Sequence, residues 1–160
     1  MNTQFFKTFI GKFALICLLA CSFSTQAKAE STVYFFVDFR TFIEEYPIAI
    51  DGEEAFKLTG IDTPKGLPTL PLYSMIMRKV TFKNSGSYVV STDFTLSGKP
   101  YHGETILNLE DDETYYVIIN GNIKKNFYME MVSEKEGLKL LKKAQTSKKY
   151  HINEPFTYDK

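Results

Sequence analysis

The stretch from Thr32 to Phe42, TVYFFVDFRTF, repeats its apolar residues with a period of two, which is the period of a β-strand. One alternate set of side chains is wholly apolar: Val33, Phe35, Val37 and Phe39. The opposite set begins with Tyr34 and Phe36 and becomes polar only at Asp38. The stretch therefore predicts a strand whose first part is apolar on both faces, unlike a strand with one face in water.

Further strands are predicted on both sides of turn sequences. Tyr46–Ile50 and Ala55–Leu58 flank Asp51-Gly52, whose residue types favour a tight turn, so we expect a hairpin. Leu72–Phe82 and Ser87–Leu96 are rich in aromatic and β-branched residues and flank a turn-like segment at 83–86. We expect these two strands to pair as a second hairpin.

The rest of the chain up to Val132 alternates between breaks and short strands. Thr59–Pro71 contains three prolines and two glycines, which predict a loop. A second break is expected at 97–100. Three more strands are predicted: Thr105–Leu109, Thr114–Asn120 (TYYVIIN) and Ile123–Val132.

A helix is expected near the end of the chain, over about 134–144. Ser133 and Glu136 have the spacing of a capping box, and Leu138, Leu140 and Leu141 supply an apolar side. The segment 150–160 has no periodic pattern, so we expect an irregular tail. Together these elements predict a mainly β fold, an antiparallel β-sandwich with one short C-terminal helix.

Residues 1–29 have the composition of a secretory leader. They contain three lysines, no acidic residue, and an apolar run from Phe13 to Phe23 that is about half of the roughly 20 residues needed to cross a membrane. Ala27-Lys28-Ala29 is a signal-peptidase sequence and predicts cleavage before Glu30. Leu18-Leu19-Ala20-Cys21 resembles a lipobox and predicts instead a lipid on Cys21. Both alternatives place the protein in the envelope of a Gram-negative bacterium, in the periplasm or as an outer-membrane lipoprotein.

Removal of the leader makes several kinds of chemistry unexpected in the mature protein. Cys17 and Cys21 leave with it, or Cys21 becomes the anchor, so disulfides, thiol catalysis and cysteine metal sites are not expected. Of 19 basic residues 16 remain against 19 acidic ones, a net charge near −3 that does not favour nucleic acid. The residues from Glu30 to Lys160 are enough for a single domain.

Five segments, in this order along the chain, carry a resemblance to a known family: VYFFVDF, an IDG turn, SGSYVV, LNLEDDETYYVIINGN and FYMEMVSEKEGLKLLKK. It resembles a bacterial domain-of-unknown-function family (2846-type) of small secreted proteins and lipoproteins. The similar region runs from about Val33 to Lys143. The resemblance implies a compact β-sandwich in the envelope, without an established activity or catalytic residues.

Two groups of polar residues are candidate sites. His102-Gly103-Glu104, with His151 and Glu154, could form a metal or acid–base cluster, but with two histidines in the whole chain we favour a role in turns. No cofactor or metal is therefore expected. The second group is a lysine series that we interpret as a solvated helix end, or alternatively as a contact with anionic headgroups or an acidic partner: Lys139, Lys142, Lys143, Lys148 and Lys149.

The strands predicted over Thr32–Phe42 and Thr114–Asn120 both carry apolar residues on their two faces. The third candidate site is the second of these faces, defined by Tyr34, Phe36, Tyr116 and Ile118. Leaving these rings in water would cost several kcal/mol at about 25 cal/mol per Å², so something must cover them. The chain's own helix, loop or tail is one candidate for the cover. A partner protein, an apolar ligand or a sugar is the other.

These observations predict an exported, non-catalytic binding or protein-interaction module, whose partner would be an envelope protein or a glycan. One alternative is a structural lipoprotein tethered through Cys21. A small envelope hydrolase is the other alternative, and it would require a concave pocket in which titratable groups converge.

Overall fold

The computed structural model describes residues 30–62, 72–122 and 125–160. The predicted leader, with Cys21 and the cleavage site after Ala29, lies outside the described residues. So does most of the predicted loop Thr59–Pro71.

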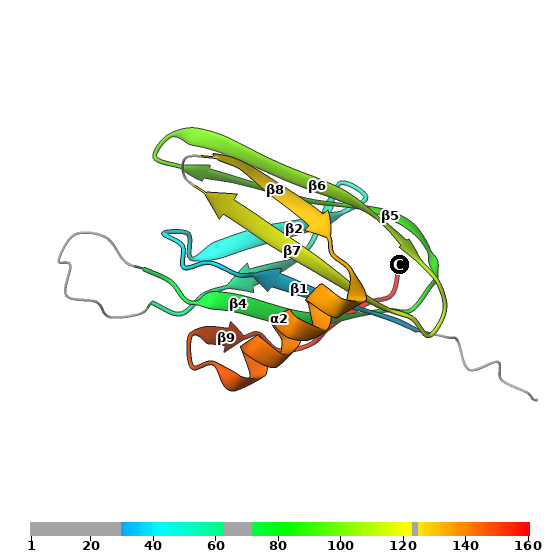
Figure 1. The fold of residues 1–160 in the computed structure, drawn as a ribbon. Coiled ribbons are helices and arrows are strands. Elements are labelled where there is room, and N and C mark those ends of the chain that lie inside the picture. Colours follow the sequence, from blue (N-terminus) through cyan, green and yellow to red (C-terminus); the bar gives the residue numbers. More distant parts are fainter. Residues whose placement is uncertain (1–29, 63–71, 123–124) are drawn as a thin grey trace, which may run out of the picture.

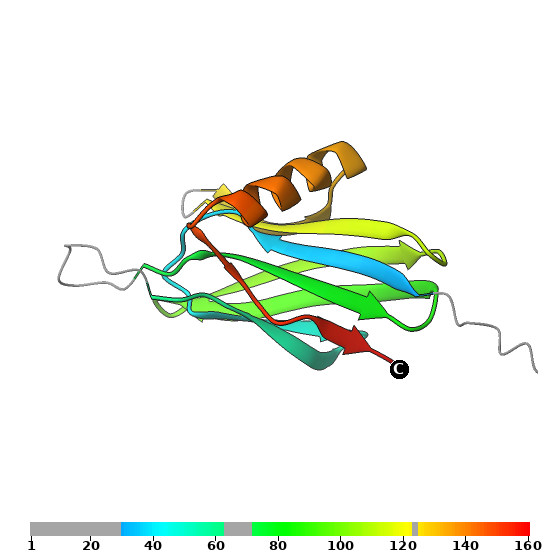
Figure 2. The same cartoon turned by 90° about the horizontal axis from the view of Figure 1, so that it is seen from below.

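Two sheets and one helix form three layers, which Figure 1 shows from the side of the helix and Figure 2 shows edge-on. The larger sheet has six strands: β1 (Ser31–Val37), β4 (Met75–Phe82), β7 (Thr114–Asn122), β8 (Lys125–Met131), β9 (Tyr150–Ile152) and β10 (Phe156–Tyr158). The smaller sheet has four: β2 (Glu45–Ile50), β3 (Glu53–Thr59), β5 (Gly86–Leu96) and β6 (Lys99–Leu109). The helix, α2 (Glu134–Thr146), lies on the outside of the larger sheet. The prediction of a mainly β sandwich with one short helix is confirmed. The larger sheet is mixed rather than antiparallel as predicted, because the pairs β1–β7, β4–β9 and β4–β10 are parallel.

β1 is central in the larger sheet, and it ends at Val37, five residues before the end predicted for the first strand at Phe42. It pairs antiparallel with β4 and parallel with β7, and β8 follows β7 at the far edge. Val33, Phe35 and Val37 point into the core between the two sheets, where they are fully buried. A strand with neighbours on both edges and layers on both faces must be apolar throughout, which explains its sequence.

The hairpin predicted at Asp51-Gly52 is confirmed. β2 and β3 pair antiparallel across these two residues, whose φ values are 51° and 83°. Positive φ at both central positions is the geometry of a type I′ turn, which matches the twist of the flanking strands.

The second predicted hairpin is wrong. β4 pairs with β1, β9 and β10 in the larger sheet, whereas β5 pairs with β2 and β6 in the smaller one. Residues 83–85 therefore carry the chain from one sheet to the other. The long hairpin is instead β5–β6, which turns at Ser97-Gly98 with φ values of 53° and 76°.

The prediction of an irregular tail is also wrong. β9 and β10 both pair parallel with β4, and between them the side chain of Asn153 bonds both backbone groups of Thr59 at 2.8–2.9 Å. The rings of Phe156 and Tyr158 pack against the inter-sheet core. Each strand is three residues long, too short for periodicity to show, and its partner strand is far away in the sequence.

The predicted helix is confirmed and is slightly longer than expected. Ser133 has extended backbone angles and its Oγ accepts from the backbone N–H of Glu136 at 3.4 Å, as in a capping box. Leu140, Leu141 and Ala144 turn toward the larger sheet, whereas Leu138, which was predicted for the same apolar side, is 50% exposed. α2 therefore supplies a second, smaller core on the outer face of that sheet.

Candidate functional site

The second apolar face of β1 and β7 is covered by α2 and by the side chain of Tyr150 on β9. Phe36 and Tyr116 are 0% and 4% exposed, and they share a cluster with Met75, Met77, Ala144 and Tyr150. Tyr34 and Ile118 are half-buried, and the ring of Tyr34 stacks on that of Tyr116 at 5.7 Å. The chain itself therefore occupies most of the face that is one candidate surface for a partner.

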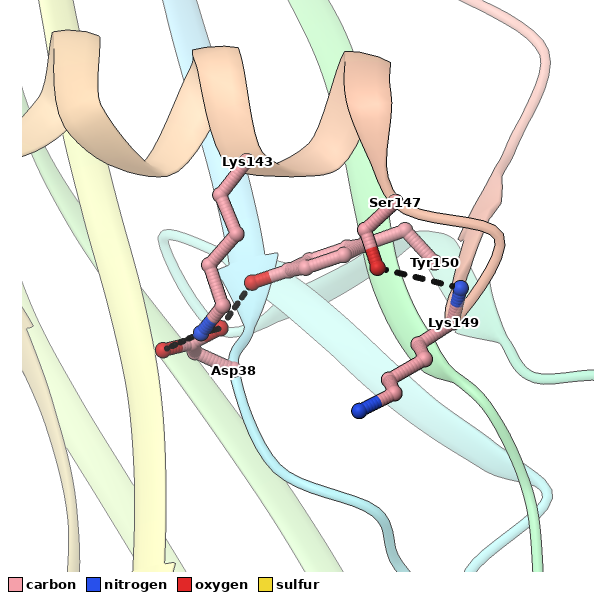
Figure 3. Close-up of polar contacts among 5 residues, drawn as sticks. All are labelled: Asp38, Lys143, Ser147, Lys149 and Tyr150. Atoms are coloured by element: carbon pink, nitrogen blue, oxygen red, sulfur yellow. Dashed lines mark hydrogen bonds and ion pairs between the residues drawn. The ribbon is translucent and has the colours of Figure 1, made fainter.

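A polar cluster fastens the end of α2 to the end of β1. Lys143 donates to both carboxylate oxygens of Asp38 at 2.7 and 2.9 Å, and the hydroxyl of Tyr150 donates to the same carboxylate (Figure 3). Burial and the bond to Asp38 both raise the pKa of Tyr150. Lys143, one of the predicted lysine series, thus has a partner within the protein. The other four are exposed, so their contact with a membrane or an acidic partner stays a prediction.

The histidine candidates do not come together. His102 and Glu104 lie within β6 rather than in a turn, so their assignment to a turn is wrong. Nδ1 of His102 lies 2.7 Å from Asp93 on the exposed face of the smaller sheet, whereas His151 and Glu154 belong to the tail on the larger sheet. Within the three described ranges, no group of three or more His, Cys, Asp or Glu could hold a metal ion.

A pocket of about 550 Å³ opens at one end of the sandwich. This is the end at which β1, β5 and β7 finish, on the left in Figure 1. Six aromatic residues contribute to its wall: Phe39, Phe42, Tyr46, Phe94, Tyr101 and Phe127. The other six lining residues are Arg40, Thr41, Ile43, Leu96, Asn120 and Gly121. Its volume and its mostly apolar wall are those of a small-molecule site.

Four of the rings form a continuous cluster that fixes the shape of the pocket. Phe94 meets Phe127 and Tyr46 edge to face, with centroids 4.6 and 5.3 Å apart, and stacks on Tyr101 at 5.3 Å. Phe94 and Tyr101 are direct cross-strand partners on β5 and β6. Such offset and edge contacts each contribute about 1 kcal/mol beyond burial, so the wall is largely preformed.

Two glycines make room for Phe127. A Cβ on Gly103 would lie 2.7 Å from the Phe127 ring, and one on Gly121 would lie 3.1 Å from that ring and 3.2 Å from Phe39. The ring is therefore seated between β6 and β7. The sequence His102-Gly103-Glu104 thus matters through its glycine, which the pocket wall requires.

Two hydroxyls of the pocket wall meet where the segment after β1 leads into β2. The hydroxyl of Tyr46 is buried and donates to Oγ1 of Thr41 at 2.7 Å, and the same oxygen accepts from the backbone N–H of Ile43 at 3.0 Å. Burial raises the pKa of Tyr46 although the bond to Thr41 opposes the shift. These contacts fix the turn that carries Arg40 and Phe42.

Sequence reasoning did not find this pocket. Phe39 and Arg40 fall at the end of the first predicted strand, Phe94 falls within a predicted strand, and Tyr101 falls in a predicted connection. A local signal does exist, because both sides of the Ser97-Gly98 turn carry an aromatic residue at matching distances. That these rings meet Tyr46 and Phe127 depends on the topology of the two sheets.

Comparison with models of known protein families finds no match, and comparison with curated proteins finds none either. The resemblance to the 2846-type family therefore stays a prediction. Across residues 30–62, 72–122 and 125–160, none of the chain forms a helix long and apolar enough to span a bilayer.

Proposed function

We propose that this protein is an exported, non-catalytic binding module of the cell envelope, and that it binds a small, largely apolar molecule in the aromatic pocket. The pocket carries the proposal, because six aromatic side chains from four strands and one loop converge on a single volume of about 550 Å³. A wall of this kind gains about 25 cal/mol for each Å² of apolar ligand surface that it removes from water.

The arrangement of the wall supports binding rather than catalysis. Its polar groups are hydroxyls, an amide and one guanidinium, and the hydroxyls of Tyr46 and Thr41 are already bonded to each other. A nucleophile or general base needs a free partner within hydrogen-bond reach of a substrate. The functional groups that this pocket offers are better suited to hold a molecule than to change it.

The ligand test uses N-phenyl-1-naphthylamine, a neutral dye whose fluorescence rises in apolar sites. We expect saturable binding to the purified protein with one dye per chain. Leu96→Trp, which places a large ring into the pocket, should weaken binding at least about tenfold. Ile106→Trp is the matched control, because Ile106 is 55% exposed on the outer face of the smaller sheet. Binding that is absent, or equal in both variants, would remove the proposal.

Export is tested separately from binding. The mass of the chain recovered from an envelope fraction distinguishes cleavage before Glu30 from a diacylglyceryl group on Cys21. Cleavage before Glu30 would contradict the tethered-lipoprotein alternative. An unprocessed chain in the cytoplasm would contradict export itself and leave the pocket's ligand test unaffected.

A further inference from the structure

One formal charge lies in the wall of the aromatic pocket. Of the twelve lining residues, all within the described ranges, Arg40 alone carries a formal charge, and none is acidic. Arg40 is half-buried, and its Nη1 atom is buried without a hydrogen-bond partner in the described part of the chain.

The acidic residues nearest to Arg40 in sequence are directed elsewhere. The carboxylate of Asp38 is bonded by Lys143 and Tyr150 on the α2 side of the sheet (Figure 3). Glu44 lies 3.5 Å from the hydroxyl of Tyr73. Arg40 thus shares the pocket wall with six aromatic residues while its neighbouring carboxylates have other partners.

A buried N–H of a guanidinium that lacks an acceptor is costly, because removal of a cation from water is compensated only by a charged or polar partner. The planar guanidinium also matches a carboxylate in a paired, two-bond geometry. An anionic group that enters the pocket would meet both a donor and an uncompensated positive charge.

We propose that the ligand of this pocket is an apolar acid, a molecule with a hydrocarbon or aromatic body and one carboxylate, and that Arg40 binds the carboxylate. The body packs against the rings of Phe94, Tyr101 and Phe127. This inference rests on the proposed function and adds the charge of the ligand to it.

The test compares decanoate with 1-decanol, which share a chain length and differ in charge, as competitors of the neutral dye. In the unaltered protein decanoate should displace the dye at a concentration roughly tenfold lower than decanol, since a charge-assisted hydrogen bond is about twice as strong as a neutral one. Decyltrimethylammonium, with the opposite charge, should be the weakest competitor.

Arg40→Met tests the residue itself, because methionine keeps a long apolar stem and removes the charge. Decanoate should lose its advantage while decanol displaces the dye as before. Lys99→Met is the matched control, since Lys99 is an exposed lysine beside the β5–β6 turn, near the pocket but outside its wall. It should leave the ratio unchanged.

The outcomes separate the two proposals. Equal competition by decanoate and decanol in the unaltered protein overturns the acid inference and leaves the apolar pocket standing, whether or not Arg40→Met folds. An advantage of decanoate that Arg40→Met retains, or that Lys99→Met removes, overturns the role of Arg40. A dye that neither compound displaces, or that does not bind, contradicts the proposed function as well.

Discussion

Gly137 of α2 lies directly against the ring of Tyr116 on β7. A Cβ built on this glycine would be 2.0 Å from Cγ of Tyr116 and 2.3 Å from Cδ2, far inside van der Waals contact. The helix therefore rests its backbone on the aromatic ring. The ring of Tyr34 also stacks on Tyr116, with centroids 5.7 Å apart, and this contact restricts movement of the Tyr116 ring.

Gly137→Ala should destabilise the protein, although alanine is the better helix former by about 1 kcal/mol. Overpacking of a filled site costs roughly 1–3 kcal/mol, and the helix must shift away from β7 to admit the methyl group. Urea unfolding followed by circular dichroism measures the difference. Lys139→Ala, an exposed position in the same helix, is the control and should change stability by less than about 0.5 kcal/mol. Equal stability of the two variants would show that the helix does not rest on Tyr116.

The elements that the sequence predicts well are those whose signal is local. The Asp51-Gly52 hairpin and the capped helix at Ser133 each depend on residues within a few positions of one another. The requirement for cover over Tyr34 and Tyr116 could also be predicted, because both alternate faces of their strands are apolar. The identity of the cover could not, since it depends on where α2 returns to the sheet.

The errors have one physical origin, which is pairing between distant segments. The composition of residues 83–86 indicates a turn, but a turn does not specify whether the chain returns to the same sheet. β4 is buried on both faces at Met75, Ile76 and Met77, whereas β5 alternates buried and exposed residues. Strands with such different patterns belong in different environments, and this contrast was the available signal. The pocket, whose wall combines β2, β5, β6, β7, β8 and the segment after β1, depends on the same long-range topology.

The tail should contribute to stability through Phe156 and Tyr158. Their rings contact Phe56 at 5.2 Å and Phe82 at 5.3 Å, which closes one edge of the sandwich. Replacing both by alanine should lower the free energy of unfolding by roughly 2–4 kcal/mol, less than for two fully buried rings. Thr157→Ala is the control, because Thr157 is exposed on the same strand and its backbone pairing with Thr81 is kept. If the double variant unfolds at the same urea concentration as the control, the tail does not close the sandwich.

Thr92→Val should stabilise the protein. Thr92 is 1% exposed on β5, and its Oγ1 atom has no hydrogen-bond partner within the described residues. Valine has nearly the same shape and removes the desolvated hydroxyl, a change that should be worth about 1 kcal/mol. Thr105→Val, at a half-buried position on the neighbouring strand, serves as the comparison. A loss of stability specific to Thr92→Val would mean that the hydroxyl has a bonding partner in solution.

Stability should fall as the pH rises above about 10, in part through Tyr46 and Tyr150. Burial raises the pKa of both phenols in the folded protein, and the bond to Asp38 raises that of Tyr150 further. In the unfolded chain a tyrosine loses its proton near pH 10, so the unfolded state releases protons first and is stabilised relative to the folded state. The contribution is thus fully present below about pH 10 and is lost above it.

Absorbance at 295 nm and circular dichroism, recorded together, should show these two tyrosines ionising only as the fold is lost. Tyr46→Phe should make the fall in urea midpoint between pH 9 and 11 shallower, whereas Tyr128→Phe, at an exposed tyrosine, should not; a Tyr46→Phe slope equal to that of the unaltered protein would contradict the assignment.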